Sequence, residues 1–234
     1  MKEFVNILQS PKDVLLKIPP KKINIIISVY DGAEFIEECL DSIQAQTYRN
    51  YKILLGVDGC QKTLEKILEI KYKYDNLFLY VSDKNNGCYP MFNALINLVP
   101  DKEYIQVFGA DDVMYPKFLE TMNNYNVPAV NRHHGVLFIK KEMFKNVGGF
   151  RNWKCAADTD MVYRIQLFYR KKIEYVPLMF HRREHPKQLT TQYSTNHKSE
   201  LRKKYNTITE RNYHSNKPKI YIKPVMSKIY EYSN

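Results

Sequence analysis

The chain has 234 residues, of which 44% are hydrophobic and 13% aromatic, enough for one substantial core and too many for a wholly disordered protein. Its net charge is +11. The four cysteines form no C-x-x-C pair and no compact disulfide framework, so we expect reduced thiols and a cytoplasmic protein. No stretch approaches the roughly 20 apolar residues that span a bilayer, so we expect a soluble protein.

Short β-branched runs alternate with helical periodicity along most of the chain, which is typical of a parallel sheet covered by helices on both faces. We expect strands at 23–29, 51–57, 77–82 and 104–108, and helices at 34–46, 61–74, 91–99 and 117–124. From 127 to 140 the pattern changes to a hairpin or mixed strand region. Two more helices are expected, at 141–147, before two glycines, and at 158–168.

Three parts are predicted: an N-terminal extension (1–22), an α/β domain (23–190) and a basic C-terminal tail (191–234). From Asn196 onward nine Lys or Arg stand against three Glu, so roughly half of the positive surplus lies in the tail. Its periodicity is weak. We interpret the tail as a solvated surface that packs on the domain or closes over a ligand, and a nucleic-acid or anionic-lipid patch is the alternative.

Polar residues follow each of the four predicted strands. The residues at these exits are Tyr30 and Asp31, Asp58 and Gly59, Asp83 to Gly87, and Asp111 and Asp112. The carboxyl ends of parallel strands share one edge of the sheet, where open α/β folds bind ligands. One Asp can accept a hydrogen bond from a nucleotide base, and another can hold a divalent cation that neutralises a diphosphate. Any single exit is explained by turns and helix caps, but the four together indicate a site.

Two common nucleotide motifs are absent. Residues 56–63 follow a strand in P-loop register, but Gln61 stands where the motif needs its second glycine, and Asp58 would place a negative charge in the phosphate cradle. No G-x-G-x-x-G follows the first strand, which argues against a Rossmann dinucleotide enzyme.

Residues 27–32 (Ile-Ser-Val-Tyr-Asp-Gly), 40–43 (Leu-Asp-Ser-Ile) and 46–48 (Gln-Thr-Tyr) occur in an order that resembles the opening strand and helix of the family 2 inverting glycosyltransferases. That family has the GT-A fold, and the resemblance extends from about residue 23 to residue 190. It implies an α/β fold with a mostly parallel nucleotide-binding sheet and a smaller mixed region on the acceptor side. It also implies donor contacts from Val29, Tyr30 and Asp31.

Further donor-binding residues follow from the same resemblance. Asp58 resembles the aspartate that binds the nucleotide base. Asn86, Gly87 and Asn93 resemble the family's Asn-x-Gly region near the donor. Arg183 resembles the arginine of an Arg-x-His element near the diphosphate.

Residues 109–112 (Gly-Ala-Asp-Asp) resemble the family's metal-binding Asp-x-Asp element, with glycine in place of the first Asp. The resemblance implies a Mn²⁺ or Mg²⁺ ion on Asp111, supported by Asp112, with Ala110 beside the donor. His185, the histidine of the Arg-x-His element, is the further expected metal contact.

Residues 148–150 (Gly-Gly-Phe) and 157–160 (Ala-Asp-Thr-Asp) resemble the stretch that ends in the family's Glu-Asp catalytic pair, with alanine in place of the Glu. Asp158 stands where the family has its general base, which would deprotonate the acceptor hydroxyl. Asp160 and Arg164 lie four residues apart on the predicted helix, and we interpret them as a structural ion pair.

The resemblance implies a metal-dependent transfer of a sugar, with inversion, from a nucleoside-diphosphate sugar to a glycan or other hydroxyl acceptor. A UDP-sugar is the default donor in this family. We expect no stable nucleic-acid partner, and membrane contact only peripherally through the basic tail. The alternative is a non-catalytic nucleotide-sugar or nucleic-acid binding protein, because the family's first metal-motif Asp and its Glu are replaced. A nucleotidyltransferase would need a glycine-rich basic signature that residues 30–35 lack.

Overall fold

The computed structural model describes residues 20–126, 128–130, 135–170 and 173–232. Its main sheet has the strand order β10-β3-β2-β1-β4-β7-β6-β8. These strands are β1 (Ile23–Val29), β2 (Tyr51–Asp58), β3 (Leu77–Ser82), β4 (Tyr104–Gly109), β6 (Ala129–Val130), β7 (Leu137–Lys140), β8 (Glu174–Tyr175) and β10 (Tyr230–Glu231). A separate antiparallel pair joins β5 (Val113–Met114) to β9 (Phe180–His181).

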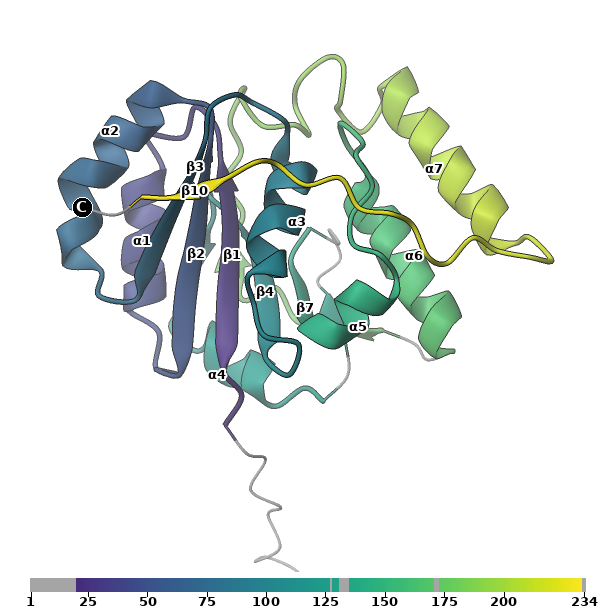
Figure 1. Ribbon diagram of the computed structural model, residues 1–234, viewed down its shortest axis with the longest axis horizontal. Coiled ribbons are helices and arrows are strands. Elements are labelled where there is room, and N and C mark those ends of the chain that lie inside the picture. Colours follow the sequence, from purple (N-terminus) through teal and green to yellow (C-terminus); the bar gives the residue numbers. More distant parts are fainter. Residues whose placement is uncertain (1–19, 127, 131–134, 171–172, 233–234) are drawn as a thin grey trace, which may run out of the picture.

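Helices cover both faces of the sheet (Figure 1). On one face lie α1 (Ile36–Gln44), α2 (Gln61–Ile70), which continues as a 3₁₀ turn (Lys71–Lys73), and α4 (Phe118–Asn123). On the other lie α3 (Cys88–Asn97), α5 (Lys141–Asn146) and α6 (Ala157–Tyr169). Successive residues of β1 face opposite sides of the sheet, and both sides are apolar. Ile25 and Ile27 pack with α1, α2 and α4, Ile26 packs with α3, α5 and α6, and all three are fully buried.

Strands β1 to β4 are parallel, and β1 pairs with β2 on one side and with β4 on the other. The chain therefore proceeds from β1 in one direction along the sheet, through β2 to β3, and returns to begin β4 on the opposite side. Open α/β sheets bind ligands at such a reversal, outside the carboxyl ends of the strands. The strands β7 and β10 run antiparallel to their neighbours β4 and β3.

The predicted α/β class and the four parallel strands are confirmed, and the helices differ mainly at their ends. Helix α3 begins at Cys88, three residues before the predicted start, because Pro90 lies in its first turn, where a missing N–H costs nothing. The predicted mixed region contains β6 and β7, paired antiparallel. Residues 127 and 131–134 of that region lie outside the described part of the chain, as do residues 1–19 of the predicted extension.

The predicted tail is more ordered than its weak periodicity indicates. It forms α7 (Glu200–Tyr213), which packs on α6, and then crosses the molecule to pair β10 with β3 (Figure 1). Gly148 has a φ of +84° and lies against the returning chain. A Cβ at this position would lie 1.8 Å from the carbonyl oxygen of Ile222, so a residue without a side chain is needed there. None of the helices in the described ranges is both long and apolar enough to cross a bilayer.

Candidate active site

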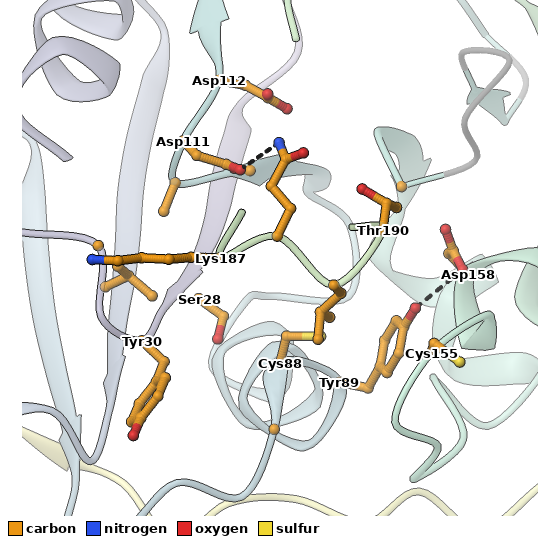
Figure 2. Close-up of a pocket in the computed structure, with 18 of the residues that line it drawn as sticks. Ser28, Tyr30, Cys88, Tyr89, Asp111, Asp112, Cys155, Asp158, Lys187 and Thr190 are labelled. Atoms are coloured by element: carbon orange, nitrogen blue, oxygen red, sulfur yellow. Dashed lines mark hydrogen bonds between the residues drawn. The ribbon is translucent and has the colours of Figure 1, made fainter. Parts of the chain in front are cut away.

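A cavity of about 630 Å³ lies at the carboxyl ends of β1, β2 and β4. Ten of the residues selected from the sequence line it: Val29, Tyr30, Asp31, Asp58, Gly87, Ala110, Asp111, Asp112, Asp158 and His185. Figure 2 shows Asp111 and Asp112 on one side of the cavity and Asp158 on the other. Carboxylates that are distant in sequence therefore face one shared space.

Asp58 ends β2 and is 1% exposed. Its carboxylate accepts the backbone N–H of Asn86 at 3.1 Å and that of Gly87 at 2.8 Å, so it fixes the loop that leads into α3. Burial raises the pKa of Asp58, and the two N–H donors act in the opposite direction. The side chain thus joins two strand exits at the cavity wall.

Asp111 lies at the centre of a polar group formed with residues that follow β9. Its Oδ2 is 3.0 Å from His185 Nε2 and accepts a hydrogen bond of 3.0 Å from Gln188 Nε2. Asp112 is more buried and accepts the backbone N–H of Arg183 at 3.2 Å. Burial, followed by the neighbouring charge of Asp111, raises the pKa of Asp112 to about 7.

The residues present fit a divalent cation at Asp111. Carboxylate oxygens are the ligands that Mn²⁺ and Mg²⁺ prefer. His185 Nδ1 and Gln188 Oε1 are buried and lack a hydrogen-bond partner within the described residues. The described residues contain no group of three or more His, Cys, Asp or Glu placed to hold a metal. Such a set is not required where substrate phosphates complete the coordination.

Asp158 is the second residue of α6 and lies opposite the Asp111 group. The Tyr89 hydroxyl donates to its Oδ1 at 3.1 Å (Figure 2). Ala156, just before the helix, has the left-handed φ of +62°, which an L side chain adopts only at a cost. Ala157, where the family pattern has Glu, is fully buried in the core. Helix α6 therefore presents a single carboxylate to the cavity at this turn.

A buried ion pair fixes α6, as expected from the sequence. Arg164 is 0% exposed and donates through Nε to Asp160 at 2.7 Å. Its two other nitrogens donate to the carbonyl oxygens of Val147 and Gly149, which precede the helix in the chain. Arg151 donates to the second oxygen of Asp160 at 2.9 Å. The helix that carries Asp158 is thereby held to the loop before it.

Three of the selected residues do not line the cavity. Asn93 is buried and donates to the carbonyl oxygens of Phe150 and Val225, so it ties α3 to the returning C-terminal chain. Asn86 holds its own loop through Asp58. The Arg183 guanidinium lies over the ring of Phe35, bonds to Glu38 and donates to the Asp111 carbonyl oxygen. These contacts give each of the three a structural role beside the cavity.

The cavity also has lining residues that the sequence analysis missed. They are Tyr89, Arg182, Lys187, Gln188, His197, Arg202 and Asn206, among others. Lys187 pairs with Glu34 at 2.9 Å and with Asp31 at 3.3 Å. Arg182 and Gln188 lie close in sequence to the selected Arg183 and His185, which was the available signal. The residues beyond 191 belong to no motif, and only the fold brings them to the site.

Solved structures of similar fold are glycosyltransferases. A mannosyltransferase from Pyrobaculum calidifontis in complex with GDP-Man and Mn²⁺ matches with a TM-score of 0.58 at 18% identity, over 74% of this chain and 59% of that one. S. aureus TarS 1–349 in complex with UDP matches with a TM-score of 0.58 at 15% identity, over 70% of this chain and 61% of that one. The fold is that of the GT-A glycosyltransferases.

Residues 24–126 match the family model described as glycosyl transferase family 2. An uncharacterised glycosyltransferase of Rickettsia prowazekii is 35% identical over 102 residues, 44% of this chain and 31% of the relative. The glycosyltransferase GlyA of Streptococcus pneumoniae is 30% identical over 101 residues, 43% of this chain and 14% of the relative. The resemblance to glycosyltransferase family 2 is thus confirmed over residues 24–126. The matched region spans less than a third of the length of these curated relatives.

Proposed function

We propose that the chain transfers a sugar, with inversion, from a nucleoside-diphosphate sugar to a hydroxyl acceptor. The observation that supports this most is that Asp58, Asp111 and Asp158 line one cavity at the carboxyl ends of the parallel strands. The similar solved structures include complexes with GDP-Man and Mn²⁺, with UDP and with UDP-GlcNAc. Asp58 and the exits of β1 and β3 are assigned to the nucleoside, and Asp111 to the diphosphate side.

Asp158 is proposed as the general base. The acceptor oxygen forms its bond to the anomeric carbon as the bond to the diphosphate oxygen breaks, and the acceptor proton passes to the Asp158 carboxylate. The hydrogen bond from Tyr89 fixes one carboxylate oxygen and leaves the other for the acceptor hydroxyl. Asp111, with Asp112 and His185 beside it, would hold a Mn²⁺ or Mg²⁺ ion, which supplies positive charge for the departing diphosphate.

The decisive experiment follows turnover and donor binding separately. UDP- and GDP-sugars are screened by thermal shift with and without Mn²⁺, because a ligand of the native state raises the melting temperature. With the donor so found, Asp158→Asn should lower turnover by about 10²–10⁴-fold while the donor Kd stays within about twofold. Asp75→Asn, which removes an exposed carboxylate, is the matched control.

Each assignment has its own contradicting result. Loss of donor binding in Asp158→Asn with normal turnover per bound donor would remove Asp158 from the chemistry. Full turnover after EDTA treatment would exclude the proposed metal on Asp111. A wild-type chain that binds the donor but neither hydrolyses nor transfers it would support the non-catalytic alternative, to which the buried Ala157 in place of the family Glu points.

A further inference from the structure

One wall of the cavity comes from the C-terminal tail, residues 191–234, which lies outside the region that matches the family model. The lining residues from this part are Gln192, His197, Arg202 and Asn206. Arg202 and Asn206 lie in the first two turns of α7, which packs on the helix that carries Asp158. The acceptor side of the proposed active site is therefore built partly from the basic tail.

Hydrogen bonds within the C-terminal tail hold the backbone N–H and the Nε of Arg202. Its Nε donates to the carbonyl oxygens of Thr195 at 2.9 Å and Asn196 at 3.3 Å, and its backbone N–H donates to the capping Ser199 Oγ at 3.3 Å. Within the described ranges, neither of its two terminal nitrogens meets a hydrogen-bond acceptor or a carboxylate. A half-buried guanidinium fixed in this way offers two parallel donors, the geometry that matches a phosphate or carboxylate.

A second arginine, Arg182, also lines the cavity and contributes positive charge near His197. Partial burial lowers the pKa of His197, and the positive charges of Arg202 and Arg182 lower it further, so both guanidinium groups lie near this imidazole. Arg182 donates through one terminal nitrogen to Thr190 Oγ1 at 2.9 Å, and its ion pair among the described residues is a loose one, 3.8 Å to the exposed Glu184. The carboxylate that also acts on His197 is Asp158. Arg182 also opposes the rise in the pKa of Asp112, so it lies between the Asp111 group and His197, whereas Arg202 acts on the Asp158 side.

The position of Arg202 indicates which half of the reaction it serves. Burial raises the pKa values of Tyr89 and Cys155, and the charge of Arg202 opposes both rises, which places it beside the residues around Asp158. Cys155, Tyr89 and Asp158 lie together in Figure 2, across the cavity from Asp111. The diphosphate of the donor is assigned to the Asp111 side, so Arg202 faces the space left for the acceptor.

We propose that Arg202, with Arg182 and His197, binds a phosphate or carboxylate group of the acceptor and so holds the acceptor hydroxyl at Asp158. The substrate class is an acidic acceptor, such as a phosphorylated or uronic-acid sugar, rather than a neutral one. This proposal rests on the proposed glycosyl transfer. The other source of the same chemistry is the diphosphate of the donor, and the experiment must separate the two.

The test uses inorganic phosphate as the probe, titrated by calorimetry into the full chain with its nucleotide site saturated by UDP or GDP and Mg²⁺. Saturable binding of phosphate is expected, weakened at least about tenfold in Arg202→Gln. Lys204→Gln is the matched control, because it removes one exposed positive charge from the same helix. Arg202→Lys keeps the positive charge but loses the pair of parallel guanidinium donors, so its affinity for phosphate should be intermediate. An intermediate value would show that the loss in Arg202→Gln does not come from misfolding.

Two results would overturn the proposal. Equal phosphate affinity in wild type and Arg202→Gln would show that Arg202 is not the anion ligand. Phosphate binding that disappears when the nucleoside diphosphate is present would assign these residues to the donor. A chain that binds neither UDP nor GDP contradicts the proposed function instead, and phosphate binding at Arg202 is then measured on the nucleotide-free chain by the same comparison of variants.

Discussion

Replacing Asp160 with leucine should lower the free energy of unfolding by about 3–5 kcal/mol, because Arg164 would remain as an uncompensated charge in the core. Both side chains are essentially inaccessible, at 1% and 0% exposure, so solvent does not screen the loss. The two carbonyl oxygens that Arg164 also contacts cannot replace a full negative charge. For a chain of this size the change corresponds to a fall in Tm of about 6–20 °C.

A double-mutant cycle isolates the pair. Asp160→Leu, Arg164→Met and the double variant are compared by urea unfolding. The double variant should be more stable than the sum of the single losses implies, by at least about 2 kcal/mol, because no unpaired charge remains. The exposed pair formed by Lys140 and Glu142 is the control, and Glu142→Gln should cost less than about 1 kcal/mol. Strictly additive losses at 160 and 164 would refute the reasoning.

Two further predictions concern the C-terminal chain and the acid range. Gly148→Ala would place a Cβ 1.8 Å from the Ile222 carbonyl oxygen at a φ of +84°, so it should cost at least about 2 kcal/mol and open residues 214–232 to protease, as mass spectrometry would show. Hydrogen bonds from two lysines lower the pKa of Glu37 to about 2, so its stabilising effect is present above about pH 4.5 and disappears as the pH falls towards about 2. Glu37→Gln should show a flatter loss of stability over that range in urea unfolding; an unchanged slope would contradict it.

The strands and the edge that carries the cavity were predictable, because a strand buried on both faces appears in the sequence as a run of apolar residues. Strand β1 is buried on both faces, so it appears as an apolar run interrupted only by Asn24 and Ser28, and its bounds follow directly. The polar residues after each parallel strand must then meet at one edge, which is why Asp58 and Asp111 could be placed together before the fold was known.

Helix α7 was not predictable from periodicity, because few of its residues enter the core. Thr209 is its one buried residue, and aromatic contacts hold the rest: Tyr205 stacks on Trp153 with ring centroids 4.4 Å apart, and Tyr213 meets Tyr163 edge-on at 4.7 Å. A helix bound by scattered aromatic contacts has no apolar stripe to detect. The sequence pattern therefore gives no indication of α7, the helix that carries Arg202.

The arginines after β9 illustrate a second limit. Successive side chains of extended backbone point to opposite sides, so an assignment displaced by one residue selects the wrong face. The family motif selected Arg183, whose side chain lies over Phe35 and bonds to Glu38 away from the cavity. Its neighbour Arg182 lines the cavity. Only three-dimensional structure distinguishes the two.

The departures from the family pattern are packed into the structure rather than left as gaps. A Cβ at Gly109 would lie 2.8 Å from Oδ2 of Asp112 and 2.9 Å from Oδ1 of Asp111, so the two carboxylates occupy the space that a first Asp of the motif would need. Ala157 is likewise fully enclosed by the core. The observed positions of Asp111 and Asp112 thus depend on the glycine at 109. Restoring the family aspartate at 109 would displace Asp111 and Asp112 before it could add a metal ligand.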